Sequence, residues 1–75
     1  MNTSSCNCSP INLTISDLNN PNLLVDSPSY TGYIPHKGDL IAIQSIGYRV
    51  EDRYIEYTHG KLTAVVLYVT RVFHV

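Results

Sequence analysis

The stretch from residue 35 to residue 75 constrains the fold of this chain most strongly. It opens with a Pro-x-x-Gly-Asp turn at residues 35–39. Three apolar-patterned segments follow, at residues 40–46, 48–57 and 62–75. The joints between them are short and contain Gly47 and Gly60. Short apolar segments separated by glycine-containing turns are typical of a β-meander, so this part of the sequence predicts an all-β fold.

The segment at residues 48–57 changes the phase of its alternation. Tyr48 and Val50 have one parity, whereas Ile55 and Tyr57 have the opposite one. Successive side chains of a strand point to opposite faces, so the pattern can keep its apolar face only if an extra residue is inserted. The change falls at residues 51–53 and predicts a β-bulge or a sharp bend there, of the kind that small barrels use to close.

Turn chemistry predicts how the meander is connected. Gly38 can take a positive φ at the entry, and Asp39 can accept hydrogen bonds from turn amides. Residues 46–47 are expected to form a hairpin joint or a bulge. Residues 58–61 are expected to form a hairpin turn with Gly60 in the left-handed conformation.

The C-terminal segment, residues 62–75, is apolar on both faces and carries one formal charge, Arg71. A strand of this kind is either central in a barrel or pairs with a second subunit, because an exposed one would associate indiscriminately. We expect a homo-oligomer that forms through this C-terminal strand.

The N-terminal third is less regular. Residues 1–10 are expected to form a flexible tail, and residues 11–75 a single small β-barrel domain. The expected order within residues 11–34 is a strand at 11–15, a turn or short 3₁₀ piece at 16–22, a short strand or plug at 23–25, a turn at 26–29 and a short edge segment at 30–34.

Charge and composition narrow the class of partner. The chain has 75 residues, five of them basic and six acidic, for a net charge of −1. Nucleic-acid binders usually have a basic excess, so nucleic acid is not the expected partner. No signal-peptide pattern and no apolar run of membrane-spanning length is visible, so we expect a cytoplasmic protein with no membrane contact.

The sequence contains no pattern that points to catalysis. No serine lies in a nucleophile-elbow context, and no glycine-rich phosphate loop is present. The carboxylates at 51, 52 and 56 alternate with Arg49 and Arg53, which favours cross-strand charge pairs on a solvated face over acid–base work. We therefore expect that the protein is not an enzyme and that it has no catalytic residues.

No metal or cofactor site is expected either. The three histidines, spread over a loop, a turn and the chain end, are His36, His59 and His74. Cys6 and Cys8 lie two residues apart in the tail, too close to form an unstrained bridge and too few to hold a structural zinc ion. We read them as tail cysteines, with an intermolecular disulfide or metal link as the alternative.

Tyrosine is the unusual feature of the composition, with six in 75 residues. Tyrosine is enriched at binding surfaces because it offers a large rigid contact area with a polar tip. We predict a partner-binding surface that includes, with basic neighbours, Tyr30, Tyr33, Lys37, Arg49, Arg53 and Tyr54. The alternative is that all six tyrosines belong to the core and its lid.

Residues 34–75 resemble a known group of proteins. The residues that carry the resemblance are Ile34-Pro35-x-x-Gly38-Asp39-x-Ile41, Tyr48-x-Val50 and Val66-Leu67-Tyr68-Val69. They resemble small SH3-like β-barrel proteins encoded by phages and mobile elements. The resemblance implies a small binding or assembly module, of phage or mobile-element origin, and transfers no catalytic residue.

Taken together, the sequence predicts a small antiparallel, strongly bent SH3-like barrel of five to six short strands. The leading functional hypothesis is a non-enzymatic interaction protein that binds a protein partner, as an assembly factor or as an inhibitor of a host defence system. Two alternatives stay open: an oligomeric binder of a small anionic ligand such as a nucleotide, and a weak single-stranded nucleic-acid binder that uses stacked tyrosines.

Overall fold

The computed structural model describes residues 10–72, with the backbone alone at residues 21 and 22. Of the predicted tail at residues 1–10, only Pro10 is among the described residues. Cys6, Cys8 and His74, for which predictions were made, lie outside them. The strands are β1 (Ile11–Asp17), β2 (Asn20–Tyr30), β3 (Leu40–Ile43), β4 (Ile46–Thr58) and β5 (Lys61–Arg71). No helix is present in the described part, so none there is long and apolar enough to cross a membrane.

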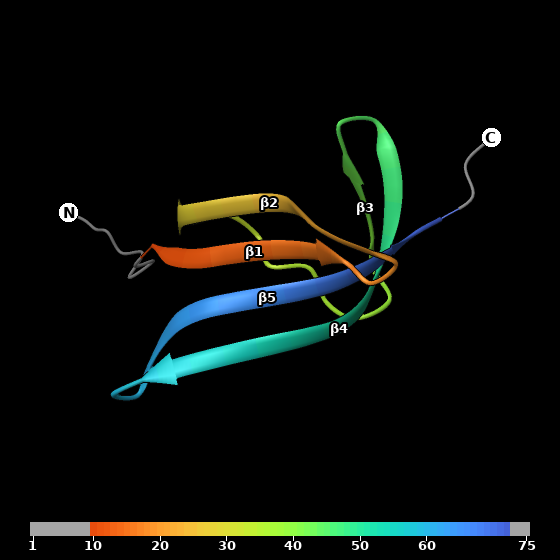
Figure 1. Cartoon of the computed structure of the whole chain (residues 1–75). Helices are drawn as coiled ribbons and strands as arrows, with labels where there is room; N and C mark the ends of the chain where they lie inside the picture. The colour runs from red at the N-terminus through yellow and green to blue at the C-terminus, as the bar shows by residue number, and fades with distance from the viewer. Residues whose placement is uncertain (1–9, 73–75) are drawn as a thin grey trace.

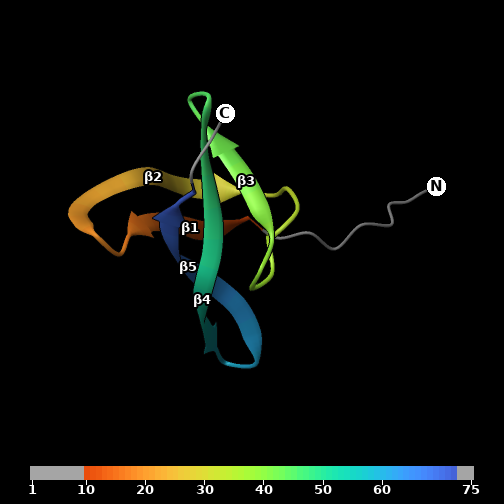
Figure 2. The same cartoon turned by 90° about the vertical axis from the view of Figure 1, so that its right-hand side faces the viewer.

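The strands form one strongly bent sheet in the order β2-β1-β5-β4-β3 (Figure 1). One layer consists of β2, β1, β5 and the C-terminal half of β4. The N-terminal half of β4 turns out of this layer and pairs with β3 (Figure 2). β2 and β3 are the two edges, so the sheet curls into a half-barrel that stays open between them. The predicted small, bent all-β fold is confirmed.

One pair departs from the antiparallel meander. β1 and β5 run parallel, with Leu13 beside Val65 and Ile15 beside Leu67. The other three neighbouring pairs are antiparallel. An alternating pattern tells which face of a strand is buried but not which way its neighbour runs, so this parallel pair could not be predicted from alternation.

The bend in β4 is a β-bulge. Val50 lies opposite Val69, but Asp52 lies opposite Tyr68, so β4 has one extra residue at Glu51. The phase change in the sequence therefore marks the bulge where it was predicted. The bulge keeps Val50 facing the core while β4 swings from one part of the sheet to the other.

The core lies on the concave side of the sheet. Alternating residues of β1 and β5 face it, because their apolar positions repeat with the period of a strand. The fully buried residues are Val65, Leu67 and Val69 of β5 and Val50 of β4. Ile11, Leu13, Ile15 and Tyr48 complete the buried cluster. β5 is therefore central in the barrel, which was one of the two positions expected for the C-terminal segment.

The two hairpin turns illustrate different solutions. His59 and Gly60 have φ values of 53° and 78°, as in a type I′ turn, so the prediction for residues 58–61 is confirmed. The predicted joint at residues 46–47 is wrong, because these residues already belong to β4. The turn is formed by Gln44 and Ser45, with φ values of 51° and 69°. Neither is a residue that usually marks such a turn.

β2 is longer than predicted. Asp26 and Ser27 pair with Thr14 and Leu13, so the turn predicted at residues 26–29 is wrong. Proline is tolerated in an edge strand, because there its missing amide hydrogen is not needed by a neighbour. The prediction of a strand at residues 23–25 is confirmed as part of β2. The edge segment predicted at 30–34 is not a strand beyond Tyr30, and residues 31–39 form a loop.

Candidate functional site

The 31–39 loop is organised around the carboxylate of Asp39. The His36 amide and the Tyr33 hydroxyl both donate to Asp39 Oδ2, each at 2.8 Å. The Asp39 amide in turn donates to the His36 carbonyl at 3.0 Å, which closes the turn. The hydrogen bond from His36, followed by that from Tyr33, holds the pKa of Asp39 below its ordinary value. Asp39 thus bonds back to a turn amide, as predicted.

Backbone hydrogen bonds anchor this loop to β4. Gly38 N donates to the carbonyl of Val50 at 2.8 Å, and Val50 N donates to the carbonyl of Asp39 at 2.9 Å. Gly38 has a φ of 93°, so it takes the positive φ expected of it. The loop is therefore fixed against the strand residue that immediately precedes the bulge.

Four of the predicted partner-binding residues lie in or beside this loop. The Tyr30 hydroxyl donates to the carbonyl of Tyr33, whose own side chain is 66% exposed. The hydrogen bond to Asp39 raises the pKa of Tyr33, and the nearby charge of Arg53 opposes that rise. We call the side chains around Asp39 the loop surface; they are the exposed Tyr33, His36 and Lys37 and the half-buried Arg53.

Arg49, another predicted residue, is held by an ion pair. Its Nε lies 3.1 Å from Glu51 Oε2, which also accepts a 2.7 Å hydrogen bond from the Thr70 hydroxyl. The Thr70 bond, followed by that from Arg49, lowers the pKa of Glu51, and the charge of Lys37 adds to the effect. The predicted cross-strand charge pairs are wrong: the ion pair joins two residues of the same strand, across the bulge.

Tyr54 points away from Arg53, because consecutive strand residues face opposite sides. It lies beside Val66, on the convex side of the sheet, and is 58% exposed. The structure thus brings together Tyr30, Tyr33, Lys37 and Arg53 and leaves Arg49 and Tyr54 elsewhere. The alternative that every tyrosine is a core or lid residue is wrong, since Tyr33, Tyr54 and Tyr57 are all exposed.

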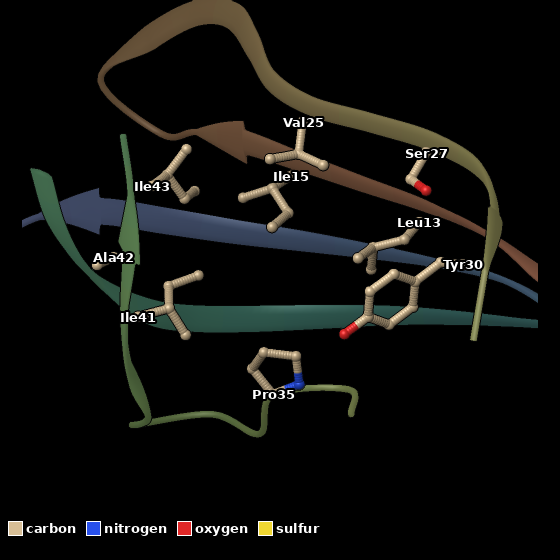
Figure 3. Close-up of a pocket in the computed structure, with 9 residues that line it drawn as sticks. All are labelled: Leu13, Ile15, Val25, Ser27, Tyr30, Pro35, Ile41, Ala42 and Ile43. Carbon is tan, nitrogen blue, oxygen red and sulfur yellow. The ribbon is translucent and has the colours of Figure 1, made fainter. Parts of the chain in front are cut away.

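Sequence reasoning missed an apolar groove of about 410 Å³ in the open side of the half-barrel (Figure 3). β1 forms its floor, β2 and β3 flank it, and the loop closes it below. Its lining residues are Leu13, Ile15, Val25, Ser27, Tyr30, Pro35, Ile41, Ala42 and Ile43. The alternation of apolar residues, at Leu13 and Ile15 and again at Ile41 and Ile43, was a sequence signal for its walls. With few polar groups, the groove suits an apolar side chain.

Metal-binding side chains do not gather in the described part of the chain. No group of three or more histidine, cysteine, aspartate or glutamate residues among residues 10–72 is arranged to hold a metal ion. His36 lies in the loop surface, and His59 lies in the β4–β5 turn.

No protein-family model, curated protein or solved structure matches this chain. The resemblance of residues 34–75 to SH3-like barrels of phages and mobile elements therefore stays a prediction. Any functional conclusion has to come from the surfaces themselves.

Proposed function

We propose that this protein is a non-enzymatic interaction module that binds another protein. The observation that carries the proposal is the number of large apolar side chains left in solvent by so small a domain. Within residues 10–72 the exposed ones are Leu18, Leu23, Tyr33, Leu40, Tyr54, Ile55 and Tyr57. Exposed apolar side chains mark an interaction site where several of them share one surface, and Leu23 and Tyr54 both lie on the convex side of the sheet.

The exposed tyrosines are held in a way that suits binding. Tyr54 and Tyr57 lie on β4, whose backbone is paired with β5, and Tyr33 is fixed through Asp39. Aromatic side chains on a rigid backbone lose little conformational entropy when a partner covers them. Such residues dominate the energy of many protein interfaces.

The single-stranded nucleic-acid alternative has less support. It relied on Arg49 and Arg53 together with stacked tyrosines. Arg49 forms an ion pair with Glu51. Tyr54 has an acidic residue two positions away on either side, Asp52 and Glu56. Carboxylates beside an aromatic platform oppose the approach of phosphates.

The experiment that tests the proposal is site-specific photo-crosslinking in the cell that makes the protein. A photo-reactive phenylalanine analogue replaces Tyr33 or Tyr54, and replaces the exposed Ser29 of β2 as a matched control. We expect one protein to crosslink from a tyrosine position and not from the control position. The purified partner should then bind the purified chain saturably in calorimetry.

Substitution of the contact tyrosine supplies the quantitative test. Tyr33→Ser or Tyr54→Ser should weaken binding of the purified partner about tenfold or more, the scale of an interface hot spot. If no crosslinked protein rebinds as a purified component, the protein-binding proposal is wrong.

A small anionic ligand is the second candidate, because Arg53 lies near Tyr33 and Lys37 lies in the same loop as Tyr33, and neither cation has an ion-pair partner within residues 10–72. A nucleotide that binds the folded state should raise the melting temperature with its concentration. Loss of that shift in Arg53→Gln, with retention in Arg71→Gln, would favour this candidate over a protein partner.

The biological setting belongs to the same proposal. The resemblance in residues 34–75 supports a phage or mobile-element protein that acts in the cytoplasm, as an assembly factor or as an inhibitor of a host defence system. An oligomer is also part of the proposal. Because β5 is paired on one side with β1 and on the other with β4, such an oligomer would use its side chains rather than its backbone.

A further inference from the structure

The convex side of the four-stranded layer forms a continuous surface that no predicted site includes. The strand register shows which residues lie side by side on it. We call these residues the outer face. From β2 to β4, its rows are Leu23, Ser16, Tyr68 and Asp52; Asp26, Thr14, Val66 and Tyr54; and Asn12, Ala64 and Glu56.

The middle of the outer face is apolar and incompletely covered. Val66, Tyr68 and Ala64 are half-buried, and Tyr54 beside them is exposed. β3 and the 31–39 loop lie together on the opposite side of the layer (Figures 1 and 2). Within the described residues, no strand packs over the outer face, so solvent reaches this apolar centre.

Charge is distributed unevenly between this face and the rest of the chain. Three of the six acidic residues, Asp26, Asp52 and Glu56, lie on the outer face, and none of the five basic residues does. All three carboxylates are exposed, and none forms an ion pair or a side-chain hydrogen bond within residues 10–72. Arg49 lies opposite Thr70, in the next row beyond Tyr68 on the same side, and is already paired with Glu51.

We propose that the outer face docks an arginine-rich segment of a partner protein. The proposal rests on the proposed function and assigns it a surface and a partner chemistry. Guanidinium groups fit both parts of this face: they form two-pronged hydrogen bonds with carboxylates, and they stack on tyrosine rings. A lysine-rich segment offers only a point charge, so it satisfies the acidic rim but not the aromatic centre.

The same charge pattern disfavours other partners at this face. Phosphates of nucleic acids and anionic lipid headgroups would approach three unpaired carboxylates with no cation to receive them. The acidic rim and apolar centre of the outer face are instead complementary to a basic segment of a protein.

Nuclear magnetic resonance with short peptide probes tests the proposal. A hexa-arginine peptide is titrated into the ¹⁵N-labelled full chain at low ionic strength, with hexa-lysine and hexa-glutamate as controls. We expect saturable shifts at the amides of Thr14, Tyr54 and Val66, tighter for arginine than for lysine and absent for glutamate. Shifts confined to the loop surface, or no shifts at all, would overturn the assignment.

Charge-matched variants sharpen the result. Asp52→Asn and Glu56→Gln should each weaken hexa-arginine binding about two- to fivefold, the scale of one exposed ion pair. Asp17→Asn is the control, because Asp17 lies outside the outer face and the amide oxygen of Asn can still accept the 2.8 Å bond from the Asn19 amide. Equal weakening by all three variants would show that only net charge matters, and would refute a specific outer-face site.

The aromatic contribution has its own control pair. Tyr54→Ser should reduce the preference for arginine over lysine, whereas Tyr57→Ser, an exposed tyrosine outside the outer face, should not. An unchanged preference in Tyr54→Ser would remove the stacking role from the proposal.

Failure of this inference can be told apart from failure of the proposed function. If the crosslinked partner still binds Asp52→Asn and Glu56→Gln with unchanged affinity, the protein remains an interaction module and the outer face is the wrong surface. If no protein partner rebinds at all, the proposed function itself fails, whatever the peptide does.

Discussion

The two halves of the β4–β5 hairpin share one backbone ladder but differ in what covers them. Near the bulge, Val50, Leu67 and Val69 are almost completely buried. Farther out, in residues 54–64, which we call the arm, Tyr54 and Tyr57 are exposed and no apolar residue is fully buried. Strand pairing therefore extends beyond the packed core. We expect the half near the bulge to supply most of the stability, whereas the arm presents side chains to solvent.

The core half gives the largest expected effect. Leu67→Ala removes a side chain that is 0% exposed from the central strand, so it should destabilise the fold by about 2–5 kcal/mol. Urea unfolding followed by circular dichroism measures the change. Leu62→Ala, a half-buried site in the arm, is the matched control and should cost clearly less. Equal losses would mean that both halves share one packed core.

Substitutions in the two turns that flank β4 should have the next largest effect on stability, one raising it and the other lowering it. Ser45→Gly should stabilise the fold by about 1 kcal/mol, because glycine adopts a positive φ without the steric cost that serine bears. Gly60→Ala should destabilise it by about 1 kcal/mol for the same reason. Thermal unfolding of both variants checks the signs. A loss in Ser45→Gly would show that the serine side chain stabilises the turn by more than its backbone costs.

Acidification should lower the stability of the fold by a smaller amount than these substitutions do. The carboxylates concerned, those of Asp39 and Glu51, both face solvent. Asp39 and Glu51 have folded pKa values below their ordinary ones. The stability that they contribute is therefore present above the unfolded pKa of about 4 and is lost as the pH falls through the folded value.

Melting temperature against pH measures this acid effect. Asp39→Asn and Glu51→Gln should each lower the melting temperature at pH 7, and the difference from the wild type should shrink in acid. A constant difference at all pH values would mean that the substitutions act by some route other than loss of the carboxylate charge.

The smallest effect on stability is expected at the arm. Tyr57→Ser replaces a side chain that is 65% exposed, so the free energy of unfolding should change by no more than about 0.5 kcal/mol. The same urea titration measures it. A loss comparable to that of Leu67→Ala would show that Tyr57 is covered in solution, by a partner copy or by the rest of the chain.

Patterns that depend on one strand could be predicted from the sequence. The parity change between Val50 and Ile55 indicated the bulge, and Gly60 indicated the arm turn. Patterns that depend on two strands could not. The parallel neighbours β1 and β5 leave no trace in alternation, and Gln44 and Ser45 carry no residue signal for a type I′ turn. Pro28 was taken as a turn residue because its place at the sheet edge was unknown.

The candidate site was predictable only residue by residue. Tyr33 and Tyr54 were chosen for their chemistry, and both are exposed. The sequence could not show that they lie on different surfaces, because this depends on the parity of Arg53 and Tyr54 after the bulge. It also could not show that Asp26, Asp52 and Glu56 share one face. That arrangement follows from pairing across four strands.

Pro28 has a consequence for how this open sheet stays finite. β2 is an edge strand: among the described strands it pairs with β1 and with no other. A neighbouring molecule that tried to add its own strand there would need a continuous row of amide donors, and Pro28 has none to give. Pro28 therefore leaves a gap in the donor row of the β2 edge, which disfavours the addition of a strand along that edge.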